Sequence, residues 1–204
     1  YRIKGKTTYA MEGSIFIAGA GVQWLRDRMK FFKKAPETEK IVKSLSNNND
    51  IYLVPAFTGL GAPYWDANAR GVLSGITRDT SPKEIVRATI EAVAYQTFDL
   101  FEAMKHDGLR PKIVKVDGGM VMNNWFSQFL SDIVNVKVLR PEVQETTALG
   151  AAFMAGLQIG VYKSLKDISK NWHLDKKFLP KMKNKSRSVL IKGWEKAVKR
   201  ALIN

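Results

Sequence analysis

The sequence predicts an α/β domain in which helices cover a mainly parallel or mixed sheet. Short β-rich apolar runs alternate with longer segments in which apolar residues recur every three or four positions, an order typical of such sheets. Capping residues and glycines also stand where those longer segments begin and end. The chain has 204 residues, of which 45% are hydrophobic and 25% charged, so we expect residues 1–204 to form one domain with a core.

The amino-terminal residues predict a hairpin. The chain opens with Tyr1 rather than Met, and "YRIKGKTTYAMEG" predicts the second half of one strand, a turn and a returning strand. We therefore expect a chain that starts inside a larger protein and a sheet that lacks its first strands. From about Ser14 to Lys30, apolar and small residues recur at helical intervals, which predicts a packed helix.

The middle of the chain predicts a buried strand and a long helix. "KKAPETEKIVKSLSNNND" is turn-rich with room for a short helix, and "IYLVPAF" predicts a largely buried strand. "SPKE" is a capping box, so a helix begins at Pro82 and runs to about Lys105, with Gly108 just past its end. Its expected inner face consists of Ile85, Ala88, Thr89, Ala92, Val93, Gln96, Leu100, Phe101 and Met104.

The remaining elements alternate between strand and helix. "KIVKVDGG" predicts a strand, the residues from near Asn123 to Val134 a helix, and "VKVLRPE" a second strand. "TTALGAAFMAGLQIG" predicts a helix that ends at Gly160. A carboxy-terminal helix is expected to dock on the domain through Val189, Leu190, Trp194, Ala197, Val198 and Leu202.

Composition argues against several kinds of site. The chain has no cysteine, and its two histidines, His106 and His173, are too few for a histidine-rich centre, so no metal site in the protein is expected. The sequence has no apolar run of about 20 residues and no signal-peptide pattern, which favours a cytoplasmic setting. The net charge of +14 attracts anions. Much of it lies after Lys176, where we interpret it as lysine exposed on a helix.

Asp117, Gly118 and Gly119 stand where a predicted strand ends and a helix begins. Ligands of open α/β sheets collect at that edge, and glycine lets them approach the main chain. Unpaired N–H groups in the first helical turn favour anions. Asn123 carries a donor and an acceptor for a base or ribose. The alternative is a tight turn in which Asn123 is a simple N-cap.

The first predicted helix holds Gly19 and Gly21, each of which costs roughly 1 kcal/mol relative to alanine in a helix interior. Close approach of another group would explain them. Gln23 lies on the same face four residues after Gly19, where its amide is placed to hydrogen-bond a ligand. The alternative is helix packing with Gln23 in solvent. For a second set of small residues we favour close helix packing: Gly150, Ala151, Ala152, Ala155 and Gly156.

Charged residues elsewhere have plainer interpretations. Asp66 and Arg70 are expected to form an ion pair that fixes their loop, and Asp79, Glu91 and Asp132 are expected to form salt bridges. The sequence contains no Ser/His/Asp relay, zinc motif or "GxxxxGK[ST]" phosphate loop. No catalytic residue is therefore assigned within this chain.

Six segments carry a family resemblance: "YAMEGSIFIAGAGVQWLRD", "VPAFTGLGAPYWDANARG", "RATIEAVAYQTFD", "VDGGMVMNNWFSQFLSDI", "RPEVQETTALGAAFMAGL" and "GWEKAVKRA". In this order they resemble the carboxy-terminal domain of the FGGY family of carbohydrate kinases, and within it the glycerol kinases. "GLGAPYWD" is the segment that favours glycerol kinases over xylulose and gluconate kinases. The segment "GVLSGITRDTSPKEIVRATIE" also fits the spacing of the second family signature.

The resemblance implies a ribonuclease H-like domain of the actin and hexokinase superfamily, facing a related amino-terminal domain across a closing cleft. It implies an enzyme that transfers the γ-phosphoryl of ATP, with Mg²⁺, to the 3-hydroxyl of glycerol. The general-base aspartate and most glycerol contacts are then expected upstream of this chain. The family's nucleotide contacts fall on Gly19, Gln23, Gly119 and Asn123. A homo-oligomer is expected, and neither nucleic acid nor a membrane is an expected partner.

Some features leave alternatives open. Gly21, Met120 and Met122 stand where alanine is common in the family, which implies a bulkier wall for the adenosine pocket. The chain alone should be inactive, because phosphoryl transfer needs groups from both domains. A kinase of another polyol or sugar is one alternative, since substrate choice lies mostly upstream. A basic module for nucleic acid or anionic lipid is the other, but aromatic residues are not interleaved with the lysines.

Overall fold

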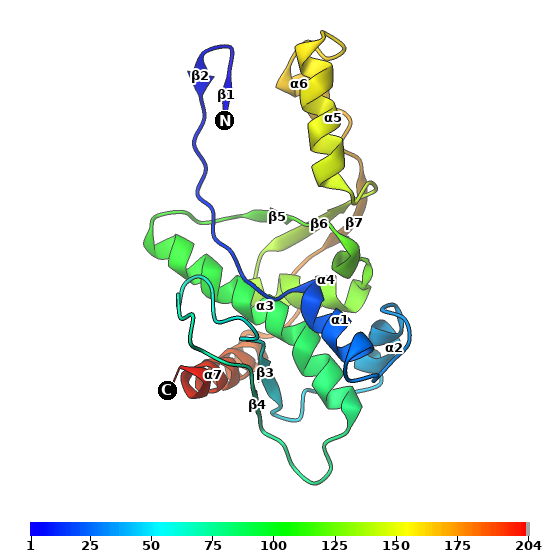
Figure 1. Cartoon of the computed structure of the whole chain (residues 1–204), viewed down its shortest axis with the longest axis vertical. Helices are drawn as coiled ribbons and strands as arrows, with labels where there is room; N and C mark the ends of the chain where they lie inside the picture. Colours follow the sequence, from blue (N-terminus) through cyan, green and yellow to red (C-terminus); the bar gives the residue numbers. More distant parts are fainter. Residues whose placement is uncertain (203–204) are drawn as a thin grey trace.

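The longest element is helix α3 (Pro82–His106), around which the body of the molecule packs (Figure 1). The computed structural model describes residues 1–202. Helix α3 begins with the predicted capping box, in which the Glu84 carboxylate accepts the Ser81 backbone N–H at 2.9 Å. Gly108, with a φ of 87°, follows its end. Both predicted boundaries are confirmed.

The first half of α3 is buried on all sides. From Glu84 to Gln96 nearly every residue is buried, whereas the residues after Gln96 are half-buried or exposed. Helices α2 (Glu37–Lys43) and α4 (Asn124–Val134) and strand β3 (Tyr52–Val54) contact this half. The prediction of a single inner face along the whole helix is therefore wrong, because several elements surround its start and few cover its end.

Buried charge on α3 is paired. Arg87 Nε donates to Glu91 Oε1 at 2.7 Å, which confirms the expected salt bridge of Glu91. Burial raises the pKa of Glu91, although the Arg87 guanidinium opposes that shift. Within residues 1–202 neither Asp79 nor Asp132 forms a salt bridge. Asp132 instead accepts two backbone N–H groups, of residues 181–182, at 2.6 and 3.1 Å.

A mixed three-stranded sheet lies beside α4. Its central strand, β6 (Lys137–Pro141), runs parallel to β5 (Ile113–Lys115) and antiparallel to β7 (Leu174–Phe178). Helix α4 contacts β6 and β7 and covers the sheet. The predicted mixed sheet with helical cover is confirmed.

A second, two-stranded sheet anchors the carboxy-terminal helix. Strand β3, fully buried as predicted, pairs antiparallel with β4 (Val72–Ser74), and α7 (Asn184–Ala201) contacts both. The Trp194 ring stacks on Tyr95 of α3 with centroids 5.4 Å apart. The docking of α7 is confirmed for Trp194, Ala197 and Val198, whereas Val189 and Leu202 are exposed.

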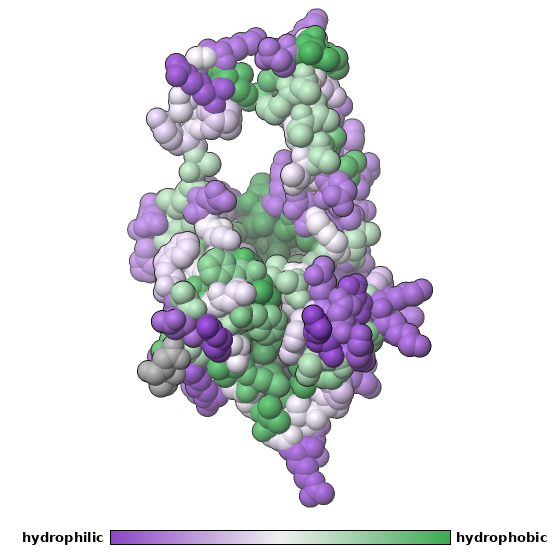
Figure 2. Space-filling view, in the orientation of Figure 1, coloured by the Kyte–Doolittle hydropathy of each residue, from purple (hydrophilic) through white to green (hydrophobic). Residues whose placement is uncertain are grey.

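Two arms project from this body (Figures 1 and 2). One is the predicted amino-terminal hairpin of β1 (Arg2–Ile3) and β2 (Lys6–Thr7), and the other holds α5 (Thr146–Gln158) and α6 (Leu165–Ser169). Figure 2 shows open space between them. Within residues 1–202 no helix combines the length and apolar composition that a membrane span requires.

The small residues of α5 do not meet a neighbouring helix as predicted. Gly156 is the buried residue of α5, and a β-carbon there would lie 2.8 Å from the Tyr162 ring. Ala151, Ala152 and Ala155 are exposed, and a β-carbon on Gly150 would meet no atom within 4 Å. The prediction is wrong for this structure because α5 lies in a projecting arm, away from the core.

Candidate functional site

Helix α1 (Gly19–Asp27) is shorter than predicted at both ends. Ala18 is its N-cap, so Gly19 is the first helical residue and not an interior one. The N–H groups of a first helical turn lack partners within the helix, which makes this turn a place for polar acceptors. A β-carbon on Gly19 would meet no protein atom within 4 Å, so the space above it is open.

Gly21 has a different role from Gly19. A β-carbon at Gly21 would lie 2.9 Å from the Thr89 methyl group on α3, closer than real β-carbons approach their neighbours. Gly21 therefore lets α1 pack closely against α3. Of the two glycines, packing explains Gly21, and only Gly19 faces open space.

The glycines after β5 change the direction of the chain. Gly118 has a φ of 83°, a conformation that favours glycine, and its N–H donates to the Gln144 carbonyl at 3.2 Å. A 3₁₀ turn, η1 (Gly119–Met122), then leads to α4. A β-carbon on Gly119 would meet no protein atom within 4 Å. Of the pair, Gly118 thus makes the turn and Gly119 leaves its backbone accessible.

Asn123 is the N-cap of α4. Its Oδ1 accepts the Phe126 N–H at 3.0 Å, and its Nδ2 donates to Thr38 Oγ1 on α2 at 3.4 Å. The N-cap interpretation is therefore confirmed. From the sequence we also expected both the donor and the acceptor of this amide to be available to a ligand, but one of each is already used within the protein. An amide has two N–H groups and two lone pairs, so one donor and one acceptor position remain for a ligand.

A cavity of about 340 Å³ brings the four predicted contact residues together. Gly19 and Gln23 line it from α1, Gly119 lines it from η1, and Asn123 lines it from the N-terminus of α4. The apolar part of the lining is Val22, Ala35, Pro36, Ile90, Met120 and Met122. The cavity thus joins segments about 100 positions apart in sequence.

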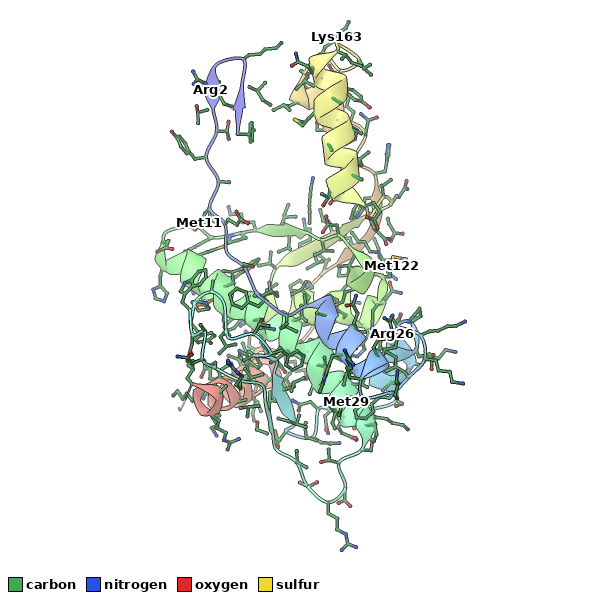
Figure 3. All side chains as sticks on the ribbon, viewed as in Figure 1. Arg2, Met11, Arg26, Met29, Met122 and Lys163 are labelled. Carbon is green, nitrogen blue, oxygen red and sulfur yellow. The ribbon has the colours of Figure 1, made fainter. Side chains whose placement is uncertain are left out.

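One cation and one anion also line the cavity. Arg26 of α1 lies on the same side of the molecule as Met122 (Figure 3), and its guanidinium donates to Asp27 at 2.7 and 2.9 Å. Glu39 of α2 accepts from Lys43 Nζ at 2.6 Å. Sequence reasoning missed α2 as a wall, because its short polar sequence carries no motif.

The loop between β3 and β4 is not held by the predicted ion pair. Asp66 Oδ1 accepts the backbone N–H groups of Asn68 and Ala69 at 2.8 and 3.0 Å. The Arg70 guanidinium donates to the carbonyls of Ala67 and Ala69 at 3.0 and 2.9 Å. The predicted pair is wrong because each side chain satisfies nearby backbone groups instead.

Asp99 of α3 ties that loop to α7. Its Oδ2 accepts the Tyr64 hydroxyl at 2.8 Å and the Trp194 indole N–H at 2.6 Å. Burial raises the pKa of Asp99 to about 6, against the two hydrogen bonds, which favour the charged form. Sequence reasoning missed this residue. The signal that could have found Asp99 is its place three positions after Gln96, a residue of the predicted inner face, on a half-buried part of the helix.

No metal centre is formed by side chains of the part of the chain that the structure describes. Within residues 1–202, no three His, Cys, Asp or Glu side chains come close enough to hold a metal ion. The polar groups around the cavity are instead hydrogen-bonding groups, backbone N–H groups and single charges. This chemistry suits an organic ligand with apolar faces and polar edges.

Comparisons with known proteins agree with the predicted fold class. Residues 2–159 match the C-terminal domain of the FGGY family of carbohydrate kinases. A solved structure of Plasmodium falciparum glycerol kinase with ADP is 37% identical, covers 93% of this chain and has a TM-score of 0.83. A xylulose kinase from Lactobacillus acidophilus, at 24% identity and a TM-score of 0.76, has the same fold.

Curated relatives extend the likeness over nearly the whole chain. Glycerol kinase 1 of Pseudomonas aeruginosa is 56% identical over 200 residues, which are 98% of this chain and 40% of that protein. A glycerol kinase of Clostridium botulinum is 53% identical over 201 residues, with the same coverage of both chains. The chain therefore spans about two-fifths of the length of these relatives. It belongs to the FGGY family of carbohydrate kinases, whose predicted ribonuclease H-like fold it has.

Proposed function

We propose that this chain is the nucleotide-binding half of an ATP-dependent glycerol kinase, which transfers the γ-phosphoryl of ATP to glycerol and gives glycerol 3-phosphate. The observation that carries the proposal is the cavity that joins Gly19, Gln23, Gly119 and Asn123, the positions to which the family resemblance assigns the nucleotide contacts. Relatives that are 53–56% identical over 98% of the chain are glycerol kinases, and a similar structure was solved with ADP.

The four residues have distinct roles in the proposal. Gly19 and Gly119 leave room for the nucleoside, because a side chain at either position would extend into the cavity. Gln23 supplies an amide to the ribose, and the free positions of the Asn123 amide face the base. A volume of about 340 Å³ falls in the range of small-molecule sites, roughly 300–1,000 Å³. Phosphates would leave the cavity toward the sheet edge at Gly118.

The rest of the machinery lies outside this chain in the proposal. An amino-terminal domain supplies the general-base aspartate, most glycerol contacts and further phosphate contacts, and Mg²⁺ enters with the phosphates of ATP. Catalysis of phosphoryl transfer depends on positioning and charge stabilisation from both sides of the transferred group. We therefore propose that the 204-residue chain alone does not turn over. A homo-oligomeric enzyme in the cytoplasm completes the proposal.

A chimera tests the function. The amino-terminal part of the Pseudomonas aeruginosa relative is joined to this chain, which replaces the aligned carboxy-terminal segment. Purified chimera should form glycerol 3-phosphate and ADP from glycerol and ATP, and the 204-residue chain should form neither. Glycerol-dependent ADP release by the chain alone would refute the two-domain proposal. A folded chimera that phosphorylates glycerol although ATP does not bind in the cavity of this chain would refute the assigned site.

A further inference from the structure

The cavity has two chemically different ends. Gly119 opens it near the end of β5, beside the turn at Gly118, and η1 then runs to Asn123. Four residues of a 3₁₀ turn advance by about 8 Å. The Asn123 amide contacts Thr38, so α2 lines the cavity at its Asn123 end. If phosphates occupy the sheet-edge end, the base reaches α2.

The α2 end adds acceptors beside the Asn123 amide. The Thr38 hydroxyl donates to the Ala35 carbonyl at 2.7 Å, so its oxygen faces Asn123 as an acceptor. Glu39 lines the same end, and its side chain is 21% exposed. An ionised carboxylate accepts hydrogen bonds and donates none. A base that presents a donor at this edge is therefore favoured.

Glu39 is held in its ionised form. Burial works to raise the pKa of Glu39, but the Lys43 ammonium and the neighbouring Asn124 outweigh it and hold the pKa below its ordinary value. Lys43 Nζ contacts one carboxylate oxygen, Oε1. A carboxylate has two oxygens and about four lone-pair positions, so Glu39 keeps acceptor capacity beyond the Lys43 contact and the hydrogen bonds from Asn124.

We propose that Glu39 selects adenine at this cavity by accepting a hydrogen bond from the 6-amino group of the base. This inference rests on the proposed nucleotide function and names the residue that reads the base. Guanine and hypoxanthine carry an oxygen at position 6, which would place an acceptor where adenine presents its amino group to Glu39. Losing a hydrogen bond to a charged group should weaken binding, so we expect the cavity to bind the adenine nucleotide roughly 10- to 100-fold more tightly than a nucleotide with an oxygen at position 6.

The test compares two nucleotides that differ at position 6, an amino group in one and an oxygen in the other, and in the hydrogen that N1 carries beside that oxygen. Dissociation constants of ADP and of inosine 5′-diphosphate are measured by isothermal titration calorimetry on the 204-residue chain. The wild-type chain should bind ADP about 10- to 100-fold more tightly. In Glu39→Gln the two affinities should fall within about 3-fold of each other, because an amide can accept from an amine or donate to an oxygen.

Glu37→Gln is the matched control. It removes the same charge from the same helix, and Glu37 does not line the cavity. This variant should keep the wild-type ratio of the two affinities. The ratio separates base reading from a structural effect, since a loosened α2 would weaken both nucleotides alike.

The possible failures are distinguishable. If ADP binds the wild-type chain and Glu39→Gln keeps the wild-type ratio, the base-reading role of Glu39 is wrong and the nucleotide site stands. If Glu37→Gln abolishes the preference as fully as Glu39→Gln does, helix charge and not the carboxylate at the cavity sets it. If the wild-type chain binds neither nucleotide, the proposed nucleotide function falls, and the role of Glu39 falls with it.

Discussion

A valine at position 119 separates the two substrates of the proposed enzyme. The protein itself has room for this side chain, since a β-carbon on Gly119 meets no atom within 4 Å and the φ of Gly119 is not positive. Gly119→Val should therefore change the free energy of unfolding by no more than about 0.5 kcal/mol. The added methyl groups point into the cavity that we assign to the nucleoside.

The expected size of the effect follows from overpacking. Forcing extra methyl groups into a filled site costs roughly 1–3 kcal/mol, which corresponds to about 5- to 150-fold in affinity. In the chimera, the KM for ATP at saturating glycerol should rise by this factor. The KM for glycerol at saturating ATP should stay within about twofold, because a cost of this kind falls on the nucleotide alone.

A second glycine supplies the control for Gly119→Val. Gly150 on α5 also has open space around its β-carbon position, and it does not line the cavity. In the 204-residue chain, Gly150→Val should leave ADP binding at the wild-type value, and Gly119→Val should weaken it. Equal increases in the two KM values of the chimera, or no change in either, would refute the placement of the nucleoside beside Gly119.

Three further predictions concern stability. The folded protein raises the pKa of Asp99 to about 6, so protonation of Asp99 adds to the free energy of unfolding. This stabilisation is full below the ordinary pKa of the group and is lost as the pH rises through about 6. Relative to Asp99→Asn, wild-type should lose about 2 kcal/mol between about pH 4 and pH 7.5 in urea unfolding; a constant difference would contradict this. Gly21→Val should cost about 1–3 kcal/mol by chemical denaturation and Gly19→Val under about 0.5; equal costs would contradict the packing of α1. Arg87→Met should cost about 3–5 kcal/mol at neutral pH, because it leaves Glu91 buried and unpaired; a change below about 1 kcal/mol would show that water reaches Glu91.

Local chemistry explains which parts of the structure could be predicted from the sequence. The capping box at Ser81, the left-handed glycine at Gly108 and the N-cap at Asn123 each depend on a few neighbouring residues. Those signals also placed Gly119 and Asn123 at the junction of a strand and a helix. The resemblance to the FGGY family then paired that junction with Gly19 and Gln23, a juxtaposition that spacing alone does not contain.

The errors in prediction came from contacts between distant segments. One error is local instead: Arg70 was predicted to pair with Asp66, but both side chains bond to backbone groups one to three positions away in the same loop. Asp99 gave no motif, since its two donors come from a loop and from α7. The first half of α3 is buried all round because four elements meet there, and periodicity reports a single face.

The central claim is that a purine nucleoside lies between Gly19 and Gly119. A crystal structure of the chain with ADP tests it most directly. We predict density for adenosine in the cavity of about 340 Å³, with the base against α2 and the phosphates directed toward Gly118. Adenosine density in the larger hollow between α4 and α7, or none between the two glycines at saturating ADP, would contradict the claim.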